Sequence, residues 1–297
     1  MDESFFCSSI ILMKIHLSQF AGFCDGVRRA YEMISALDIA QAKKPIYILG
    51  SLAHNADVVR EIHKKGIFKI DLEDFLQSKK GEIGTIIVTA HGVGPEIFDI
   101  AKEKDIEIID TTCPKVIKVQ RLAKVFSARD YSIILIGDKG HKEVEGINSW
   151  GRGKSRIVST QEDLENLDFS KNEKIIVLSQ TTQSEEFFEK AGNFIKNKFP
   201  DTQIISTICY TTHDRQGEIS KLAQKNDVVV VIGSKESANS TRLFEIAKEK
   251  NPQTYFIENS NQLEKKWFLR VEKALVTAGA STPSWVIEEV VKEIEKL

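Results

Sequence analysis

Three cysteines stand at corresponding points along the chain. Cys24, Cys113 and Cys209 are separated by 89 and 96 residues, and each follows a short apolar run. Thiolates are soft ligands that bind zinc, copper or iron–sulfur clusters. Three protein ligands also leave one coordination position open for a substrate. The pattern therefore predicts a metal or cluster site with catalytic access. The alternative for each cysteine alone is a small core residue. Cys7 lies outside the pattern and is interpreted as incidental.

The sequence around these cysteines indicates that each stands where a helix begins. GFCDGVRRA and TTCPKV show the transition, and Pro114 suits the first helical position. A helix N-terminus lowers the pKa of a thiol and favours negative charge, which suits an anionic cluster. The cysteines have no short paired spacing, and the composition is that of a cytoplasmic protein, so structural disulfides are not expected.

Histidines follow the ends of several expected strands. His54, His91 and His141 each come shortly after a strand-end Gly or Ala. Imidazoles can be neutral or cationic near neutral pH and can therefore match the charge of a diphosphate. A zinc site built from these three histidines is the alternative. Their neighbours are uncharged hydroxyl and amide donors, which favours anion recognition.

Other polar side chains share these loops. Glu143, two residues beyond His141, is a candidate proton donor in such a cavity, whereas on an open surface it would be a solvated charge. Hydroxyl and amide donors at expected helix starts suit phosphate oxygens, although such residues are often only helix caps. The donors are Ser237, Asn239, Ser240, Thr181, Thr182, Gln183, Ser281 and Thr282.

The elements that must position these residues repeat three times. Apolar runs alternate with charged helical segments, which is typical of βαβ units and parallel sheets. Runs ending at Gly50, Gly137 and Gly233 follow the three cysteines by 26, 24 and 24 residues, and a further run in each copy reaches Thr89, Ser179 and Thr277. Weaker strands are expected at 68–70, 156–159 and 255–258. A period near 90 residues favours three similar small α/β domains with parallel sheets over the alternative, one continuous doubly wound sheet.

Ligands of parallel α/β sheets bind beyond the carboxyl ends of the strands. If the three units surround a pseudo-threefold axis, the reactive loops of all three meet in one cavity. The expected domains are residues 13–110, 111–206 and 207–282, with residues 283–297 completing the third unit or packing back on the first. Met13 is a candidate natural start, with residues 1–12 an N-terminal extension.

The bulk composition excludes several classes of function. The 297 residues carry a formal charge of −2, from 41 basic and 43 acidic side chains, so there is no field for nucleic acid or for an anionic membrane. No apolar run approaches the ~20 residues that span a bilayer. The apolar stretch at 5–13 follows Asp2 and Glu3, so no signal peptide is predicted. Nucleotide-binding glycine motifs are missing, so the electrons for a reduction would come from a partner protein.

Taken in order, several segments resemble the 4-hydroxy-3-methylbut-2-enyl diphosphate reductase family of the non-mevalonate isoprenoid pathway. They are GFCDGVRRA, AHGV, DTTCP, GHKEVEG, QTT, ICYTTHDRQ, GSKESANSTRL and TAGAST, and they run from Lys14 to the C-terminus. The resemblance implies a trefoil of three α/β domains around a central [4Fe–4S] cluster. One cluster per chain would be held by Cys24, Cys113 and Cys209, with one iron open to the substrate hydroxyl.

The resemblance also implies roles for residues around the cluster. Glu143 would deliver protons, and Thr181 would position the substrate and its water. Ferredoxin or flavodoxin would supply two electrons, and the products would be isopentenyl and dimethylallyl diphosphates. The diphosphate would be bound by His54, His91, His141, Ser237, Asn239 and Ser281.

One position departs from the family pattern. The family has two serines before the Asn of the third-unit loop, and here the second is Ala238. This change removes one side-chain hydrogen bond to phosphate and puts affinity in doubt. Two other classes of function stay open at this point: a cluster-dependent hydro-lyase that uses the iron only as a Lewis acid, and a non-catalytic diphosphate-binding or cluster-sensing protein.

Overall fold

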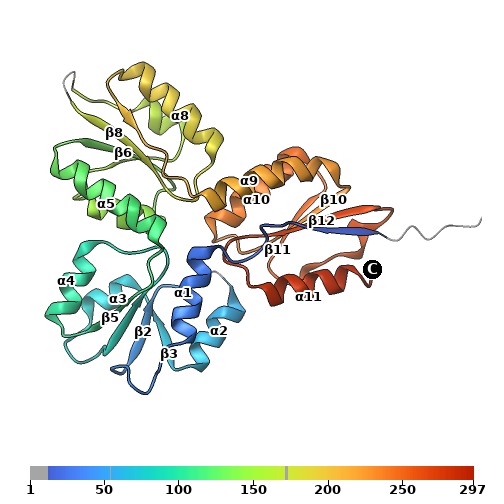
Figure 1. The fold of residues 1–297 in the computed structure, drawn as a ribbon, viewed down its shortest axis with the longest axis horizontal. Helices are drawn as coiled ribbons and strands as arrows, with labels where there is room; N and C mark the ends of the chain where they lie inside the picture. Colours follow the sequence, from blue (N-terminus) through green and yellow to red (C-terminus); the bar gives the residue numbers. More distant parts are fainter. Residues whose placement is uncertain (1–12, 54, 171–172) are drawn as a thin grey trace, which may run out of the picture.

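The computed structural model describes residues 13–53, 55–170 and 173–297. The predictions that concern His54, Cys7 and the extension at 1–12 lie outside these residues. Three separate four-stranded sheets are present, each with all of its strand pairs parallel. They form three lobes around a common centre (Figure 1). The predicted three α/β units with parallel sheets are confirmed, and the single continuous sheet is excluded.

The first unit is built on the sheet β3-β2-β4-β5. Its elements are α1 (Asp25–Ser35), β2 (Ile46–Leu49), α2 (Ala56–Lys64), β3 (Ile67–Ile70), α3 (Leu72–Gln77), β4 (Thr85–Val88), α4 (Pro95–Glu103) and β5 (Glu107–Asp110).

The second unit repeats this order in the sheet β7-β6-β8-β9. Its elements are α5 (Pro114–Ala128), β6 (Ser132–Ile136), α6 (Lys142–Trp150), β7 (Arg156–Val158), α7 (Gln161–Glu165), β8 (Ile175–Ser179), α8 (Glu185–Lys198) and β9 (Gln203–Ile204).

The third unit contains α9 (Tyr210–Leu222), β10 (Val228–Ile232), α10 (Ala238–Lys250), β11 (Thr254–Ile257), β12 (Lys273–Ala278) and α11 (Ser284–Ile294), with short 3₁₀ turns at Ala223–Lys225, Ser260–Gln262 and Lys265–Phe268. Its fourth strand is β1 (Lys14–Leu17), which pairs with β12, Lys14 opposite Lys273. In Figure 1 the blue β1 accordingly lies in the orange-red lobe. The first unit predicted from the sequence, residues 13–110, includes this strand. The sheet instead takes its edge strand from the start of the chain.

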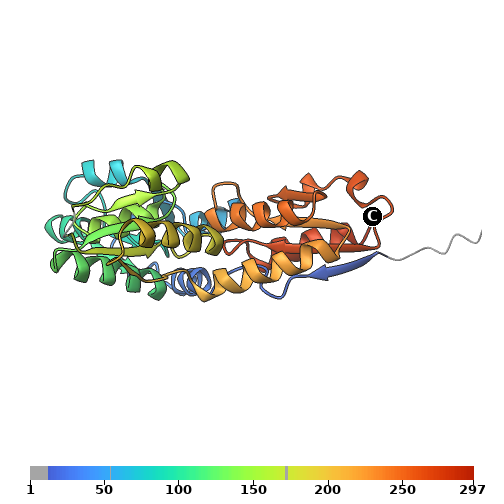
Figure 2. The same cartoon turned by 90° about the horizontal axis from the view of Figure 1, so that it is seen from above.

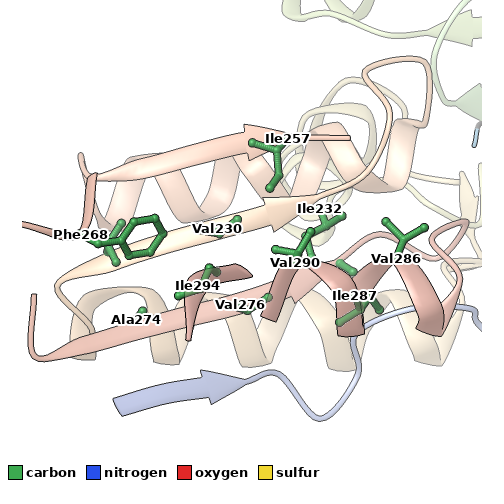
Figure 3. Close-up of a cluster of buried hydrophobic side chains, with 12 residues drawn as sticks. Val230, Ile232, Ile257, Phe268, Ala274, Val276, Val286, Ile287, Val290 and Ile294 are labelled. Atoms are coloured by element: carbon green, nitrogen blue, oxygen red, sulfur yellow. The ribbon is translucent and has the colours of Figure 1, made fainter. Parts of the chain in front are cut away.

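Apolar side chains cover both faces of each sheet, as parallel sheets require. In the third unit all five residues of β10, Val228–Ile232, are buried. Val286, Ile287, Val290 and Ile294 of α11 pack on the face of β10 and β12, as Figure 3 shows. The C-terminal helix thus completes the third unit, one of the two arrangements expected.

Side chains from other elements closely approach the strand-end glycines of the repeat, where a side chain would not fit. A Cβ at Gly50 would lie 2.2 Å from the Nζ of Lys142, and one at Gly233 would lie 2.4 Å from the Oγ of Ser240. A Cβ at Gly137 would lie 2.7 Å from a methyl of Val144. Residues in the first turns of α6 and α10 therefore pack directly on these glycines. Among the helices of the described ranges, none combines the length and apolar content needed to cross a bilayer.

Candidate active site

Each cysteine of the repeat stands at the junction of two units. Cys24 links β1 of the third sheet to α1 of the first unit, Cys113 links β5 to α5, and Cys209 links β9 to α9. Each is therefore the N-cap of a helix that follows the edge strand of the preceding sheet. Because all three connections leave the carboxyl ends of parallel strands, they meet at the centre of the trefoil.

One cavity occupies this centre, with a volume of about 790 Å³ that includes its opening to solvent. Every described residue to which the family resemblance assigns a role lines it, as does Thr182, whereas the other expected donors, Ser240, Gln183 and Thr282, do not. The residues with an assigned role are Cys24, Cys113, Cys209, His91, His141, Glu143, Thr181, Ser237, Asn239 and Ser281. Every unit contributes to this wall, so the residues come together only when the three units are assembled.

The thiols lie in a drier environment than the sequence indicated. Burial raises the pKa of Cys24 and of Cys113, and it outweighs the first-turn N–H groups of the following helix, which lower each pKa. The expected net lowering by the helix N-termini is therefore wrong for these two free thiols. The charge of Arg215 acts in the opposite direction to burial and favours the thiolate of Cys24.

The spacing of the cysteines fits a multi-atom group better than a single ion. In the part of the chain that the structure describes, no three His, Cys, Asp or Glu side chains are close enough to hold one metal ion. The three thiols nevertheless face one cavity. Gly26 keeps the cysteines accessible, because a Cβ there would lie 2.6 Å from the sulfur of Cys113 and 3.9 Å from that of Cys24. A cluster that bridges three separated sulfurs fits this donor set.

In the same cavity, Glu143 accepts two hydrogen bonds from Thr181. The backbone N–H of Thr181 donates at 2.6 Å and its hydroxyl at 2.8 Å. The carboxyl group is only 1% exposed. This burial raises the pKa of Glu143 to about 7, although the two hydrogen bonds act to lower it. The carboxyl group can therefore hold or release a proton near neutral pH.

Two of the three predicted histidines are described, and their rings are adjacent. The ring centroids of His91 and His141 lie 5.6 Å apart in an edge-to-face arrangement. His141 caps α6, where its Nδ1 accepts a hydrogen bond from the N–H of Glu143 at 3.2 Å. Nε2 is therefore the nitrogen of His141 that carries a proton in the neutral ring. Both imidazoles line the cavity beside the carboxyl group.

The third unit supplies uncharged donors around the first turn of α10. Ser237, Asn239 and Ser281 are all at least nine-tenths buried. The Nδ2 of Asn239 is buried with no hydrogen-bond partner among the described residues. A buried amide without a partner is costly, and a bound anion would satisfy it. Ala238 also lines the cavity, at the place where the family pattern has a serine.

Sequence reasoning missed Arg215. This residue is 6% exposed, lines the cavity and donates hydrogen bonds to the carbonyl oxygens of Gly22 at 2.7 Å and Ala278 at 3.1 Å. Its Nε is buried without a partner among the described residues. A signal was present: Arg215 and Gln216 lie on the buried face of α9, between Thr212 and Ile219. Polar residues at helical core positions indicate a buried polar site.

The fold and site together define a class: an α/β protein of three parallel-sheet units whose junction cysteines face one polar cavity. The family model described as LytB protein matches residues 15–295. This chain therefore belongs to the LytB family. The resemblance inferred from the motifs is confirmed.

Curated relatives agree over nearly the full length. The 4-hydroxy-3-methylbut-2-enyl diphosphate reductase of Campylobacter hominis is 38% identical over 287 residues, which are 96% of this chain and 100% of the relative. The protein of the same name from Aquifex aeolicus is 36% identical over 289 residues, 96% of this chain and 97% of the relative.

Solved structures show the same architecture. The E-1-hydroxy-2-methyl-but-2-enyl-4-diphosphate reductase from Plasmodium falciparum superposes with a TM-score of 0.87 at 33% identity, covering 94% of this chain and 87% of that one. A structure of (E)-4-hydroxy-3-methyl-but-2-enyl diphosphate reductase, described as the terminal enzyme of the non-mevalonate pathway, gives 0.67 at 37% identity, covering 95% and 99%.

Proposed function

We propose that this chain reduces 4-hydroxy-3-methylbut-2-enyl diphosphate to isopentenyl and dimethylallyl diphosphates. The observation that carries the proposal is the cavity itself, in which three junction cysteines share a wall with the Glu143–Thr181 pair and with neutral donors around α10. The names of the relatives support the substrate. Cys24, Cys113 and Cys209 would hold one [4Fe–4S] cluster with one iron open.

The reaction needs two electrons and two protons. The allylic C–O bond breaks, the hydroxyl group leaves as water with one proton, and the electrons with the second proton form the new C–H bond. When bound, the cluster supplies the electrons and a Lewis-acidic iron for the hydroxyl group. Ferredoxin or flavodoxin would deliver the electrons, and the free cysteines suit a reducing compartment such as the cytoplasm.

The protein's own groups bind the substrate and move protons. Ser237, Asn239 and Ser281 would bind the diphosphate with His91, His141 and His54, of which His54 lies outside the described residues. Glu143 holds a proton at its buried carboxyl group and donates it toward the leaving hydroxyl group. The hydroxyl of Thr181, 2.8 Å from that carboxyl group, orients the proton and the substrate oxygen.

The test is an anaerobic assay of purified protein. We expect a brown protein with iron and sulfide in equal amounts, which loses colour in air. With reduced methyl viologen and the substrate it should form both products. Turnover without any reductant would instead identify a hydro-lyase, and substrate binding without product would identify a binding protein. Stoichiometric zinc without sulfide would overturn the cluster assignment.

A further inference from the structure

Helix α5 has a charge pattern that the catalytic site explains only at Lys115, which lines the central cavity. Its charged residues are all basic: Lys115, Lys118, Arg121 and Lys124. The whole chain carries a formal charge of −2, so this helix is a local exception. It begins directly after Cys113, which is its N-cap. A basic surface therefore starts two residues from a proposed cluster ligand.

The outward side of α5 is also partly apolar. A shallow groove open to solvent is lined by Pro114, Ile117, Lys118, Arg121, Leu122 and Val125. These positions repeat every three to four residues and so share one face of the helix. The opposite face, with Val119 and Ala123, packs in the core of the second unit. Val125 is 44% exposed and adds an apolar side chain to the solvent-facing side of this groove.

This surface continues to the starts of the other two cysteine-capped helices. The Nζ of Lys115 lies 4.6 Å from the ring centroid of Tyr210, the first residue of α9, and Tyr210 is 51% exposed. The hydroxyl of Tyr210 donates a hydrogen bond to Asp25, the first residue of α1. Figure 2 shows α5 in green, α1 in blue and α9 in gold along one side of the flattened molecule.

We infer that the outward face of α5 is the docking surface for an acidic one-electron carrier protein. The inference rests on the proposed function and identifies how its electrons arrive. An apolar centre with basic flanks matches a carrier that has an exposed apolar edge and an acidic rim, because complementary charge raises the rate of encounter and selects the partner. The carrier docks beside Cys113, is oxidised by one electron and leaves, so each turnover uses two docking events.

The test compares two charge reversals of equal size. Lys118→Glu/Arg121→Glu changes the groove, whereas Lys64→Glu/Lys190→Glu changes exposed lysines on α2 and α8, which have no part in it. The anaerobic holoenzyme is titrated with an acidic flavodoxin and with an acidic ferredoxin, and the dissociation constant is measured by calorimetry at low and high salt. Thermal unfolding and iron content show that each variant is folded and loaded.

We expect the groove variant to weaken binding of at least one carrier by about tenfold or more at low salt, and high salt to weaken wild-type binding as well. The control variant should bind like wild type. With reduced methyl viologen, all three proteins should turn over equally, because a small reductant needs no docking surface. Equal carrier affinity in groove and control variants would overturn the inference, as would carrier binding that is insensitive to salt.

The same assays separate this inference from the proposed function. Failure of wild-type turnover with reduced methyl viologen would reject the function. Normal viologen turnover together with unaffected carrier affinity would reject only the docking surface. Concentration-dependent dimerisation that the groove substitutions abolish would show that a second copy of the chain occupies this face, and this would also overturn the inference.

Discussion

Thr181 donates two hydrogen bonds to one buried carboxyl group, that of Glu143. The distances are 2.6 Å from its N–H and 2.8 Å from its hydroxyl. The pair is held within one unit, since Glu143 lies in the first turn of α6 and Thr181 in the loop after β8. Its geometry does not depend on how the three units close, so the carboxyl group that we propose as the proton donor is held in place by its own unit.

Replacement of Glu143 by Gln should therefore remove a proton and leave the shape intact. The amide can still accept from the N–H of Thr181. Loss of general acid catalysis costs about 10²–10⁴-fold, and we expect kcat to fall by that order. Iron content and substrate affinity should stay near those of wild type. Near-full activity in a variant with normal iron content would exclude Glu143 from the mechanism.

The raised pKa of Glu143 also predicts a pH dependence of stability. The folded state keeps this proton up to a pH of about 7, whereas the unfolded chain releases it near the ordinary value of 4.5. Between these values the folded state binds more protons, so the free energy of unfolding falls as the pH rises through this window. The rise in the pKa of Glu143 corresponds to a decrease of about 3 kcal/mol in the free energy of unfolding across this window. The difference in urea midpoint between Glu143→Gln and wild type should grow between pH 4.5 and 7 and then level off. A constant difference would contradict the assignment.

The sequence predicted most of the architecture because its repeat carries local signals. The cysteines, the strand-end glycines and the weak strands all recur at similar spacing. In the structure the cysteines lie at the junctions between units and the glycines follow the ends of strands, and the weak strand expected at 68–70 is β3. The edge strand Lys14–Leu17 was expected in the first unit but pairs with β12. Four residues with an alternating pattern identify a strand but not the sheet that it joins, because pairing depends on contacts remote in sequence.

The sequence predicted residues that line the candidate site, but it did not predict the residues that support them. Most of the described residues predicted at strand ends line one cavity, since the loops of parallel sheets meet beyond the carboxyl ends of the strands. Arg215 and Gly26 were not predicted, because their roles arise only from contacts remote in sequence: Arg215 reaches Gly22 and Ala278, and Gly26 faces Cys113. The net effect of burial on the thiols was also missed. Desolvation depends on the depth of the assembled cavity, which no single segment determines.

Gly26 offers a test of the shared cysteine site. A Cβ at this position would lie 2.6 Å from the Sγ of Cys113, so Gly26→Ala must displace that thiol. We expect iron content after anaerobic reconstitution to fall sharply, as it should for Ser at Cys24, Cys113 or Cys209. Gly217→Ala is the matched control, since nothing lies within 4 Å of its Cβ position inside α9. The control should load fully and gain up to about 1 kcal/mol. Full loading of Gly26→Ala would show that the thiols tolerate the displacement.

Ala238 provides a test on the diphosphate side. Ala238→Ser adds a hydroxyl at the first residue of α10, beside Ser237 in the cavity wall. A hydrogen bond to a charged group contributes about 1.5–3 kcal/mol at most, so we expect KM to fall by a modest factor with kcat little changed. Steady-state kinetics with reduced methyl viologen measure both constants. An unchanged KM would mean that water or the backbone already satisfies that phosphate oxygen.

The buried charge of Arg215 should act on the reduction potential of the bound cluster. Among the charges that act on the guanidinium, Cys24 has the largest effect, and the positive charge in turn favours the thiolate of Cys24. A cation beside thiolate ligands stabilises the more negative, reduced state, and burial strengthens this effect because water screens it weakly. Arg215→Gln should therefore shift the midpoint potential to a more negative value.

Arg215→Lys keeps the charge but cannot reproduce both hydrogen bonds, to Gly22 at 2.7 Å and to Ala278 at 3.1 Å. Both variants should lower the midpoint of thermal unfolding, whereas only the Gln variant should show the full shift in potential. Spectroelectrochemical titration of the three loaded proteins separates the two effects. Equal potentials in wild type and Arg215→Gln would limit Arg215 to its hydrogen bonds with the carbonyl oxygens of Gly22 and Ala278.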